Sequence, residues 1–155
     1  ANLPTSRGEA PSLQTEPYSA AFNDALFASY RDVDGAVRAQ DVTIFDARSA
    51  GRFSGAEPEP RPNLPSGHMP GAINIPFNLL IESATGGFKS KDQLRNIFGD
   101  SLSIEQGIIT TCGSGVTACV LALALYPLGI TARVYDGSWT EWASQPDANI
   151  RVLSS

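Results

Sequence analysis

Histidine, cysteine and positive charge are all scarce in this chain. Its 155 residues include one His, two Cys and 11 Lys or Arg against 16 Asp or Glu, for a net charge of −5. Two cysteines are too few for a disulfide framework, and with one histidine they supply a structural zinc site poorly. The acidic balance argues against nucleic-acid binding, which needs a basic face. We therefore expect no metal and no nucleic-acid partner.

Long apolar runs are missing as well. No stretch reaches the roughly 18 apolar residues that suggest a membrane-spanning helix, so no membrane partner is expected. What is present is an ordinary globular composition, with 42% apolar and 17% charged residues. The length suits one domain that buries its own core. Residues 1–20 hold three prolines among Ser and Thr and are predicted to form a linker. We place the domain at 21–150 and a C-terminal tail at 151–155.

Short apolar runs alternate with helical patterns through the domain. The predicted strands are 25–30, 42–46, 72–75, 107–111 and 131–135, and the predicted helices are 32–40, 91–98, 116–126 and 138–143. Asp32 and Ser90 are the candidate N-caps. A loop rich in Gly and Pro fills 49–67, with one helical turn near Arg52, and a second turn is expected at 78–81. This alternation predicts an α/β fold, with a mainly parallel five-stranded sheet and helices on both faces.

Residues 107–118, with the sequence GIITTCGSGVTA, are the most informative part of the chain. A β-branched strand leads into Cys112, and Gly113 and Gly115 then allow a tight loop in which backbone amides converge. A helix follows from Val116. Converging amides and a helix N-terminus both favour negative charge, so the pattern predicts a thiolate near neutral pH. The alternative is a buried cysteine in an ordinary strand-to-helix turn.

The same loop excludes one chemistry. Tyrosine phosphatases use Cys-x5-Arg, in which the arginine clamps a phosphate dianion. Here that position is Ala118, and no basic residue occurs between Cys112 and Arg133. The loop therefore suits a singly charged sulfur species, a thiolate or a persulfide, held by amides.

Five motifs in register carry a family resemblance. The loop CGSGVT at 112–117 is similar to the active-site loop of the rhodanese superfamily and, within it, of the 3-mercaptopyruvate sulfurtransferases. Thiosulfate-preferring rhodaneses carry basic residues in this loop, where this chain has Gly and Ser. The other agreeing segments are 46–48, 51–61, 67–72 and 135–139. The resemblance extends from about Phe22 to about Ile150, so 21–150 is expected to be a rhodanese-like catalytic domain.

The resemblance implies a sulfurtransferase without a metal or organic cofactor. Cys112 would take the sulfur of 3-mercaptopyruvate, a 2-oxo acid thiol, and become a persulfide while pyruvate leaves. Ser114 would relay a proton. A thiol such as thioredoxin, or cyanide, would accept the sulfur. The predicted substrate-binding residues are Arg52 and Arg61, which would hold the carboxylate, and Gly113, Gly115, Val116 and Thr117 of the loop.

Proteins of this group are usually tandem, and this chain looks like the catalytic C-terminal half. The resemblance therefore implies an N-terminal rhodanese domain as partner. It also implies a cytoplasmic location, or a mitochondrial one if the protein is eukaryotic and a transit peptide lay upstream. The alternatives are a thiosulfate-using rhodanese, a rhodanese-fold phosphatase and a non-catalytic rhodanese-like binding domain.

Five further side chains invite a function but suit a structural role. Arg48 is expected to pair with a nearby acid. His68 could suggest a Cys–His hydrolase, but it lies in a Gly-Pro turn and is expected to be structural. Cys119 could act as a resolving thiol, yet it is expected to be a packed cysteine within a helix. Trp139 and Trp142 are predicted to be core residues.

Overall fold

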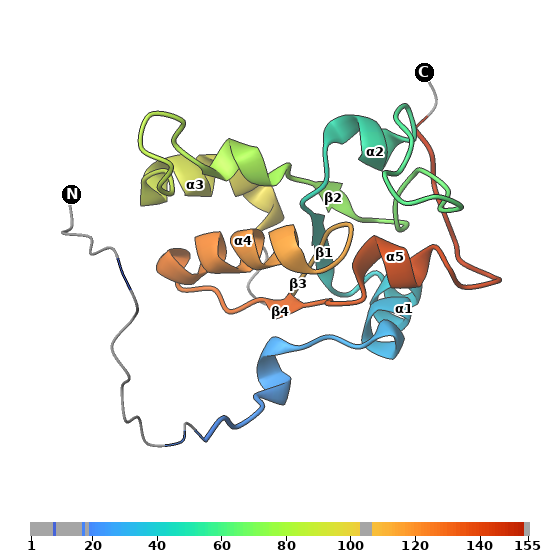
Figure 1. Ribbon diagram of the computed structural model, residues 1–155, viewed down its shortest axis with the longest axis horizontal. Helices are drawn as coiled ribbons and strands as arrows, with labels where there is room; N and C mark the ends of the chain where they lie inside the picture. Colours follow the sequence, from blue (N-terminus) through green and yellow to red (C-terminus); the bar gives the residue numbers. More distant parts are fainter. Residues whose placement is uncertain (1–7, 9–16, 18, 103–106, 154–155) are drawn as a thin grey trace.

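Four parallel strands and five α-helices make up the described part of the chain, which is residues 8, 17, 19–102 and 107–153 of a computed structural model (Figure 1). The strands are β1 (Thr43–Asp46), β2 (Ile73–Asn74), β3 (Ile108–Thr111) and β4 (Arg133–Val134). The helices are α1 (Tyr30–Ala39), α2 (Ala50–Ser54), α3 (Lys91–Phe98), α4 (Val116–Leu125) and α5 (Ser138–Trp142). Four 3-10 turns accompany them: η1 (Asp24–Leu26), η2 (Phe77–Leu80), η3 (Gly99–Ser101) and η4 (Tyr126–Leu128).

The sheet has the order β2-β1-β3-β4, and every pairing is parallel. This confirms the predicted α/β fold with a parallel sheet. Asp46 lies opposite Thr111, so the carboxyl ends of β1 and β3 lie side by side. Such an edge is where open α/β sheets bind ligands.

The predicted strand at 25–30 is wrong, and the described sheet therefore has four strands instead of five. Only Phe27 pairs, through a parallel bridge to Val134 of β4. The Asn23 side chain caps η1 by accepting a hydrogen bond from the Ala25 amide. Ser29 and Asp32 then form a capping box that begins α1 at Tyr30. Local side-chain caps therefore override the apolar run.

Caps also decide the beginnings of the other helices. Asp32 is the third residue of α1 and not its N-cap, which is Ser29. Ser90 caps α3 as predicted, and it forms a second capping box with Gln93. The expected turn near Arg52 is α2.

The core has two halves, one on each face of the sheet, as strand alternation requires. Phe45 and Ile108 point to one face, where α3, η2 and α4 cover them. Ile44 and Ile109 point to the other face, which α1 and α5 cover. Figure 1 shows this arrangement, with α3 and α4 on one side of the strands and α1 and α5 on the other.

Both predicted terminal segments are described only in part. Residues 1–20 lie mostly outside the described residues. At the other end, the Arg151 amide donates to the His68 carbonyl at 2.9 Å, and the Leu153 amide donates to the Ser54 carbonyl at 3.0 Å. The described part of the predicted tail therefore packs on the domain. None of the described helices has the length and apolar character needed to cross a membrane.

Candidate active site

Cys112 stands at the carboxyl edge of the sheet, directly after β3. Its residue surface is 2% exposed, and it packs among the core residues beneath α4. The loop turns at Gly115, which is the N-cap of α4 and has a φ of +84°. The first turn of α4, with its free amides and positive dipole end, therefore faces the sulfur.

The environment of Cys112 lowers its pKa. Burial raises the pKa, because a thiolate loses hydration inside the protein. Hydrogen bonds to the sulfur from the Thr117 hydroxyl, the Ser114 and Ala118 amides and the Ser138 hydroxyl lower it by more. The net result is a pKa below the ordinary value for cysteine. Donors aimed at a thiol favour the thiolate, which is the nucleophilic form of cysteine.

Helix α5 holds the loop from the other side. The Trp139 amide donates to the Cys112 carbonyl at 2.9 Å, and the Thr140 amide donates to the Gly113 carbonyl at 3.1 Å. The Ser138 hydroxyl oxygen accepts hydrogen bonds from the amides of Cys112 at 3.1 Å and Gly115 at 3.0 Å. It lies 3.9 Å from the Cys112 sulfur. Ser138 thus fixes both ends of the turn that surrounds the sulfur.

Ser138 and Ala118 are the site residues that the sequence did not indicate. Ser138 lies within the motif 135–139 that supports the family resemblance, which was the available signal. Its contact with the loop is between residues distant in sequence, so no local pattern reports it. Ala118 contributes only its amide, which any residue would supply.

Glycine is needed at positions 113 and 115 for different structural reasons. A Cβ on Gly115 would lie 2.4 Å from Asp136 Oδ1 and 2.9 Å from the Asp136 carbonyl oxygen, besides requiring a positive φ. A Cβ on Gly113 would lie 2.8 Å from Arg52 Nη2. Gly113 therefore lets a guanidinium approach the loop.

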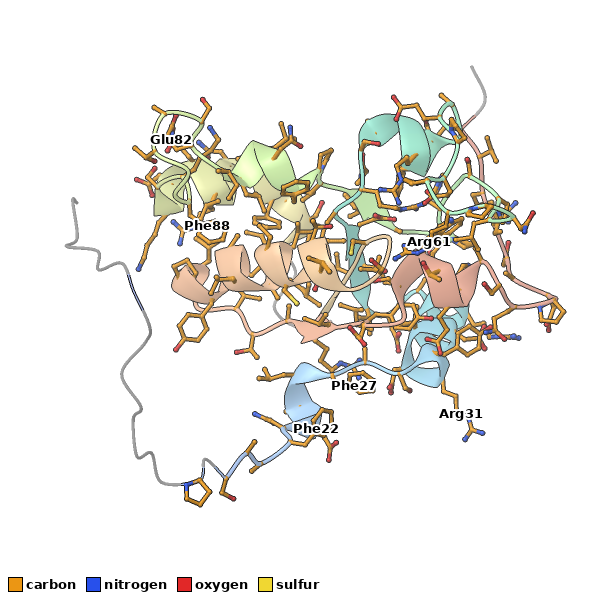
Figure 2. The ribbon with its side chains drawn as sticks, in the orientation of Figure 1. Phe22, Phe27, Arg31, Arg61, Glu82 and Phe88 are labelled. Carbon is orange, nitrogen blue, oxygen red and sulfur yellow. The ribbon has the colours of Figure 1, made fainter. Side chains whose placement is uncertain are left out.

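The structure brings both predicted arginines to this loop. Arg52, on α2, lies against Gly113 and pairs with Glu59, with 2.5 Å between Nη2 and Oε2. Arg61 donates from Nη1 to the Thr140 hydroxyl at 3.3 Å, and that hydroxyl donates to the Gly113 carbonyl at 2.6 Å. Figure 2 shows the Arg61 side chain beside α5. Two cationic groups thus approach the loop from the segment 51–61.

The other predicted loop residues contribute unequally. Thr117 and Ser114 both reach the sulfur, Thr117 through its hydroxyl and Ser114 through its amide. Val116 begins α4 and is 74% exposed as a residue. The substrate and proton-relay roles assigned to these residues stay predictions.

Arg48 makes the expected ion pair. It is buried, and its Nη2 lies 2.6 Å from Asp46 Oδ2 and 2.8 Å from the Gly67 carbonyl. Its Nη1 lies 2.8 Å from Glu59 Oε1, and its guanidinium lies over the Trp139 ring. Removing one member of such a buried pair typically costs about 3–5 kcal/mol, because the other charge stays buried alone.

Three of the remaining expectations are confirmed and one is wrong. The buried His68 ring stacks on Phe53 and uses Nδ1 on the Phe53 carbonyl at 2.8 Å, as a structural histidine does. Trp139 and Trp142 are core residues. Cys119 is exposed and not packed, because its position on α4 faces outward. Within the described residues, no group of three or more His, Cys, Asp or Glu side chains could hold a metal ion.

Comparison with known proteins shows the family of the chain. A family model of the rhodanese-like domain matches residues 29–145. The chain belongs to the rhodanese family. It is 38% identical over 143 residues to human 3-mercaptopyruvate sulfurtransferase, in an alignment covering 91% of this chain and 48% of that protein. It is 40% identical over 139 residues to rat thiosulfate sulfurtransferase, covering 87% of this chain and 46% of that protein.

The fold agrees with a solved rhodanese. The crystal structure of SseA from Escherichia coli, described as showing the rhodanese fold and catalytic mechanism of 3-mercaptopyruvate sulfotransferases, superposes with a TM-score of 0.66. The identity is 40%, and the match covers 79% of this chain and 45% of that one. The chain thus spans about half the length of the relatives it matches.

Proposed function

We propose that this rhodanese domain is a sulfurtransferase that takes sulfur from 3-mercaptopyruvate and carries it as a persulfide on Cys112. The observation that carries the proposal is a buried thiol with a lowered pKa, in a loop that Arg52 meets at Gly113 and Arg61 meets through Thr140. The names and sequences of the relatives support the same reaction. An unreactive binding domain would need neither the sulfur-directed donors nor the arginines.

The first step is a displacement at sulfur. The Cys112 thiolate forms an S–S bond with the thiol sulfur of the donor, and the bond between that sulfur and carbon breaks. The electron pair of the broken bond goes to carbon, so pyruvate leaves as its enolate and takes up one proton. The Cys112 persulfide retains the sulfur and its hydrogen. Amide and hydroxyl donors of the loop stabilise the anionic form of the persulfide after this step.

Arg52 and Arg61 supply the contact that selects a 2-oxo acid. A planar guanidinium matches a carboxylate with two parallel hydrogen bonds. Loss of one such contact is worth about 1.5–3 kcal/mol, which is roughly a ten- to over a hundredfold change. Replacing either arginine by alanine should act mainly on KM, because the carboxylate is bound similarly before and during reaction.

Proton delivery and sulfur release complete the cycle. Ser114 belongs to the loop and is the proposed relay to the enolate carbon. A thiolate acceptor, from a small thiol or thioredoxin, then attacks the outer sulfur and releases the Cys112 thiolate. Cyanide would accept the same sulfur to give thiocyanate. These steps require no metal or organic cofactor.

A second rhodanese domain is the proposed partner, because the tandem-length relatives extend beyond the matched part. We propose that it forms one wall of the site. The isolated chain should form the persulfide with a lower kcat/KM than a tandem protein, and the added partner domain should restore part of the activity. The cytoplasm or a mitochondrial compartment is the proposed location; one relative is named as mitochondrial.

The test is the mass of the protein after incubation with 3-mercaptopyruvate. We expect a gain of one sulfur atom, mapped to Cys112 and removed by cyanide, with release of pyruvate. Thiosulfate is the competing donor, because one relative is named for it. A higher kcat/KM with thiosulfate would transfer the assignment to that reaction, and no sulfur gain from either donor would contradict a sulfurtransferase.

A further inference from the structure

Glu59 is buried on a loop that is otherwise largely exposed. It stands between Pro58 and Pro60, and its side chain is 2% exposed. Its Oε1 accepts hydrogen bonds from Arg48 Nη1 at 2.8 Å and Arg52 Nε at 3.2 Å. Its Oε2 accepts from Arg52 Nη2 at 2.5 Å. Both oxygens therefore hold Arg52, which fixes the plane of its guanidinium.

The contact with Arg48 anchors Glu59 to the sheet. Arg48 is fully buried and binds Asp46, the last residue of β1. The charges alternate from Asp46 through Arg48 and Glu59 to Arg52. Each buried charge thus has a partner of opposite sign, which offsets the cost of removing it from water. The series forms a rigid connection from the sheet edge to Arg52.

Arg52 lies at the end of this connection, where it meets the loop of Cys112. Its side chain remains 22% exposed, so a ligand can still reach part of it. Its Nη2 lies within contact distance of Gly113. The direction in which Arg52 presents its remaining donors is therefore set by Glu59.

If only its charge mattered, Glu59 would weaken the binding of an anionic substrate. Its carboxylate neutralises Arg52, whereas Arg61 has no acidic partner among the described ion pairs and hydrogen-bonds Thr140. An anionic ligand is repelled by Glu59, so removal of that negative charge should improve binding if only electrostatics acted. If Glu59 instead orients Arg52, its removal should weaken binding. The two explanations differ in sign.

We propose that Glu59 is the positioning residue for recognition of the substrate carboxylate, acting through Arg52. This inference rests on the proposed function, because it concerns the same 2-oxo acid site. Glu59 fixes the orientation of Arg52, although its negative charge reduces the net attraction of the site for an anion. Arg61 supplies the uncompensated positive charge that attracts the anion.

The experiment compares Glu59→Gln with Glu57→Gln. Glu57 lies two positions away on the same loop, is exposed, and hydrogen-bonds Ser49 at 3.2 Å instead of an arginine. Both substitutions remove one negative charge from the same loop. Glu59→Gln should raise KM for 3-mercaptopyruvate roughly 10- to 100-fold, the scale of a misoriented binding group, with a smaller change in kcat. Glu57→Gln should leave KM unchanged or slightly lower it. Persulfide formation from thiosulfate, which has no carboxylate, should change less than twofold in both.

A KM in Glu59→Gln that equals or falls below the wild-type value would overturn the proposal. If that variant fails to fold by circular dichroism, Arg52→Lys replaces it, because lysine keeps the charge but cannot pair in a planar, bidentate way. An unchanged KM in Arg52→Lys would overturn the proposal equally.

Equilibrium binding of pyruvate separates this inference from the reaction itself. A wild-type chain that binds pyruvate but gains no sulfur from 3-mercaptopyruvate would contradict the proposed function. Weaker pyruvate binding by Glu59→Gln would still support the role of Glu59. A wild-type chain that binds no pyruvate would overturn the role of Glu59 in carboxylate recognition, whereas the sulfur gain would still decide the proposed function.

Discussion

Cys112 lies just before helix α4 and Cys119 lies within it, yet their surroundings shift their pKa values in opposite directions. Cys112 is buried and has a lowered pKa, because hydrogen-bond donors surround its sulfur. Cys119 is exposed and has a raised pKa, through partial burial of its sulfur and then the nearby charges of Cys112 and Asp136. Exposure alone would rank the two thiols the other way.

The difference follows from where each sulfur meets the helix. The first four amides of an α-helix have no partner within the helix. Cys112 lies before α4 and receives such amides, including that of Ala118. Cys119 lies inside α4, and its thiol donates to the Gly115 carbonyl at 3.4 Å. Only its own backbone amide favours the thiolate there, and partial burial together with the charges of Cys112 and Asp136 outweighs that amide.

Exchanging each sulfur for oxygen should give the largest contrast between the two positions. Cys112→Ser should reduce turnover and persulfide formation below detection, because a serine hydroxyl is not ionised near neutral pH and forms no persulfide. Cys119→Ser should retain wild-type kcat/KM within about twofold, since surface substitutions seldom matter. Steady-state assays with circular dichroism as a folding control test this pair. Loss of activity in Cys119→Ser would give the exposed thiol a role in transfer.

Adding a methyl group at Gly115 should displace the loop around Cys112 without changing the Cys119 side chain. Alanine there would adopt a φ of +84° and approach Asp136 too closely. Gly129→Ala is the matched control, because its φ is +83° and nothing lies within 4 Å of its Cβ. Both should lose about 1–3 kcal/mol of unfolding free energy through backbone strain. Only Gly115→Ala should also lose more than tenfold in kcat/KM, and equal activities would show that the loop tolerates displacement.

Ser138→Ala should have an intermediate effect. The change leaves the amides of Cys112 and Gly115 without their acceptor, at about 1–3 kcal/mol for each unsatisfied buried group. We expect lower stability and roughly a tenfold fall in kcat/KM, measured by denaturant unfolding and steady-state kinetics. Unchanged values for both would remove Ser138 from the site.

Thr117→Val should have the smallest effect, and that effect should depend on pH. The substitution removes a hydroxyl that stabilises the thiolate, so the pKa of Cys112 rises. The thiolate is the reactive form, so the rate at neutral pH should fall severalfold and recover at alkaline pH. A pH–rate profile checks this, and a uniform loss at every pH would assign Thr117 to substrate binding instead.

The local parts of this comparison could be predicted from sequence, and the long-range parts could not. The strand, Cys112, the glycine turn and the helix are consecutive, so the residue pattern alone placed a cysteine with a lowered pKa at the sheet edge. Ser90 likewise marked the beginning of α3, because its capping box is local. The strand predicted at 25–30 failed because caps at Asn23 and Ser29 outweighed a short apolar run.

The supports of the site come from elements distant in sequence. Ser138 reaches the loop from α5, and Glu59 reaches Arg52 from a proline-rich loop. No periodicity reports such contacts, because they depend on how the sheet brings the ends of its strands together. The outward position of Cys119 was missed for a related reason. Helix α4 is apolar on all sides, so its pattern does not identify the buried face.

The pH dependence of alkylation at both cysteines, followed in one sample by mass spectrometry with iodoacetamide, tests the central difference most directly. The exposure of a thiol changes its maximal alkylation rate, whereas the pH at half of that maximal rate reports its pKa. We expect Cys112 to reach half its maximal rate below the pH of about 8.5 that is ordinary for cysteine, and Cys119 above it. At pH 7 the buried Cys112 should then react faster than the exposed Cys119. Coincident midpoints, or a higher midpoint for Cys112, would contradict the conclusion that this loop activates its thiol.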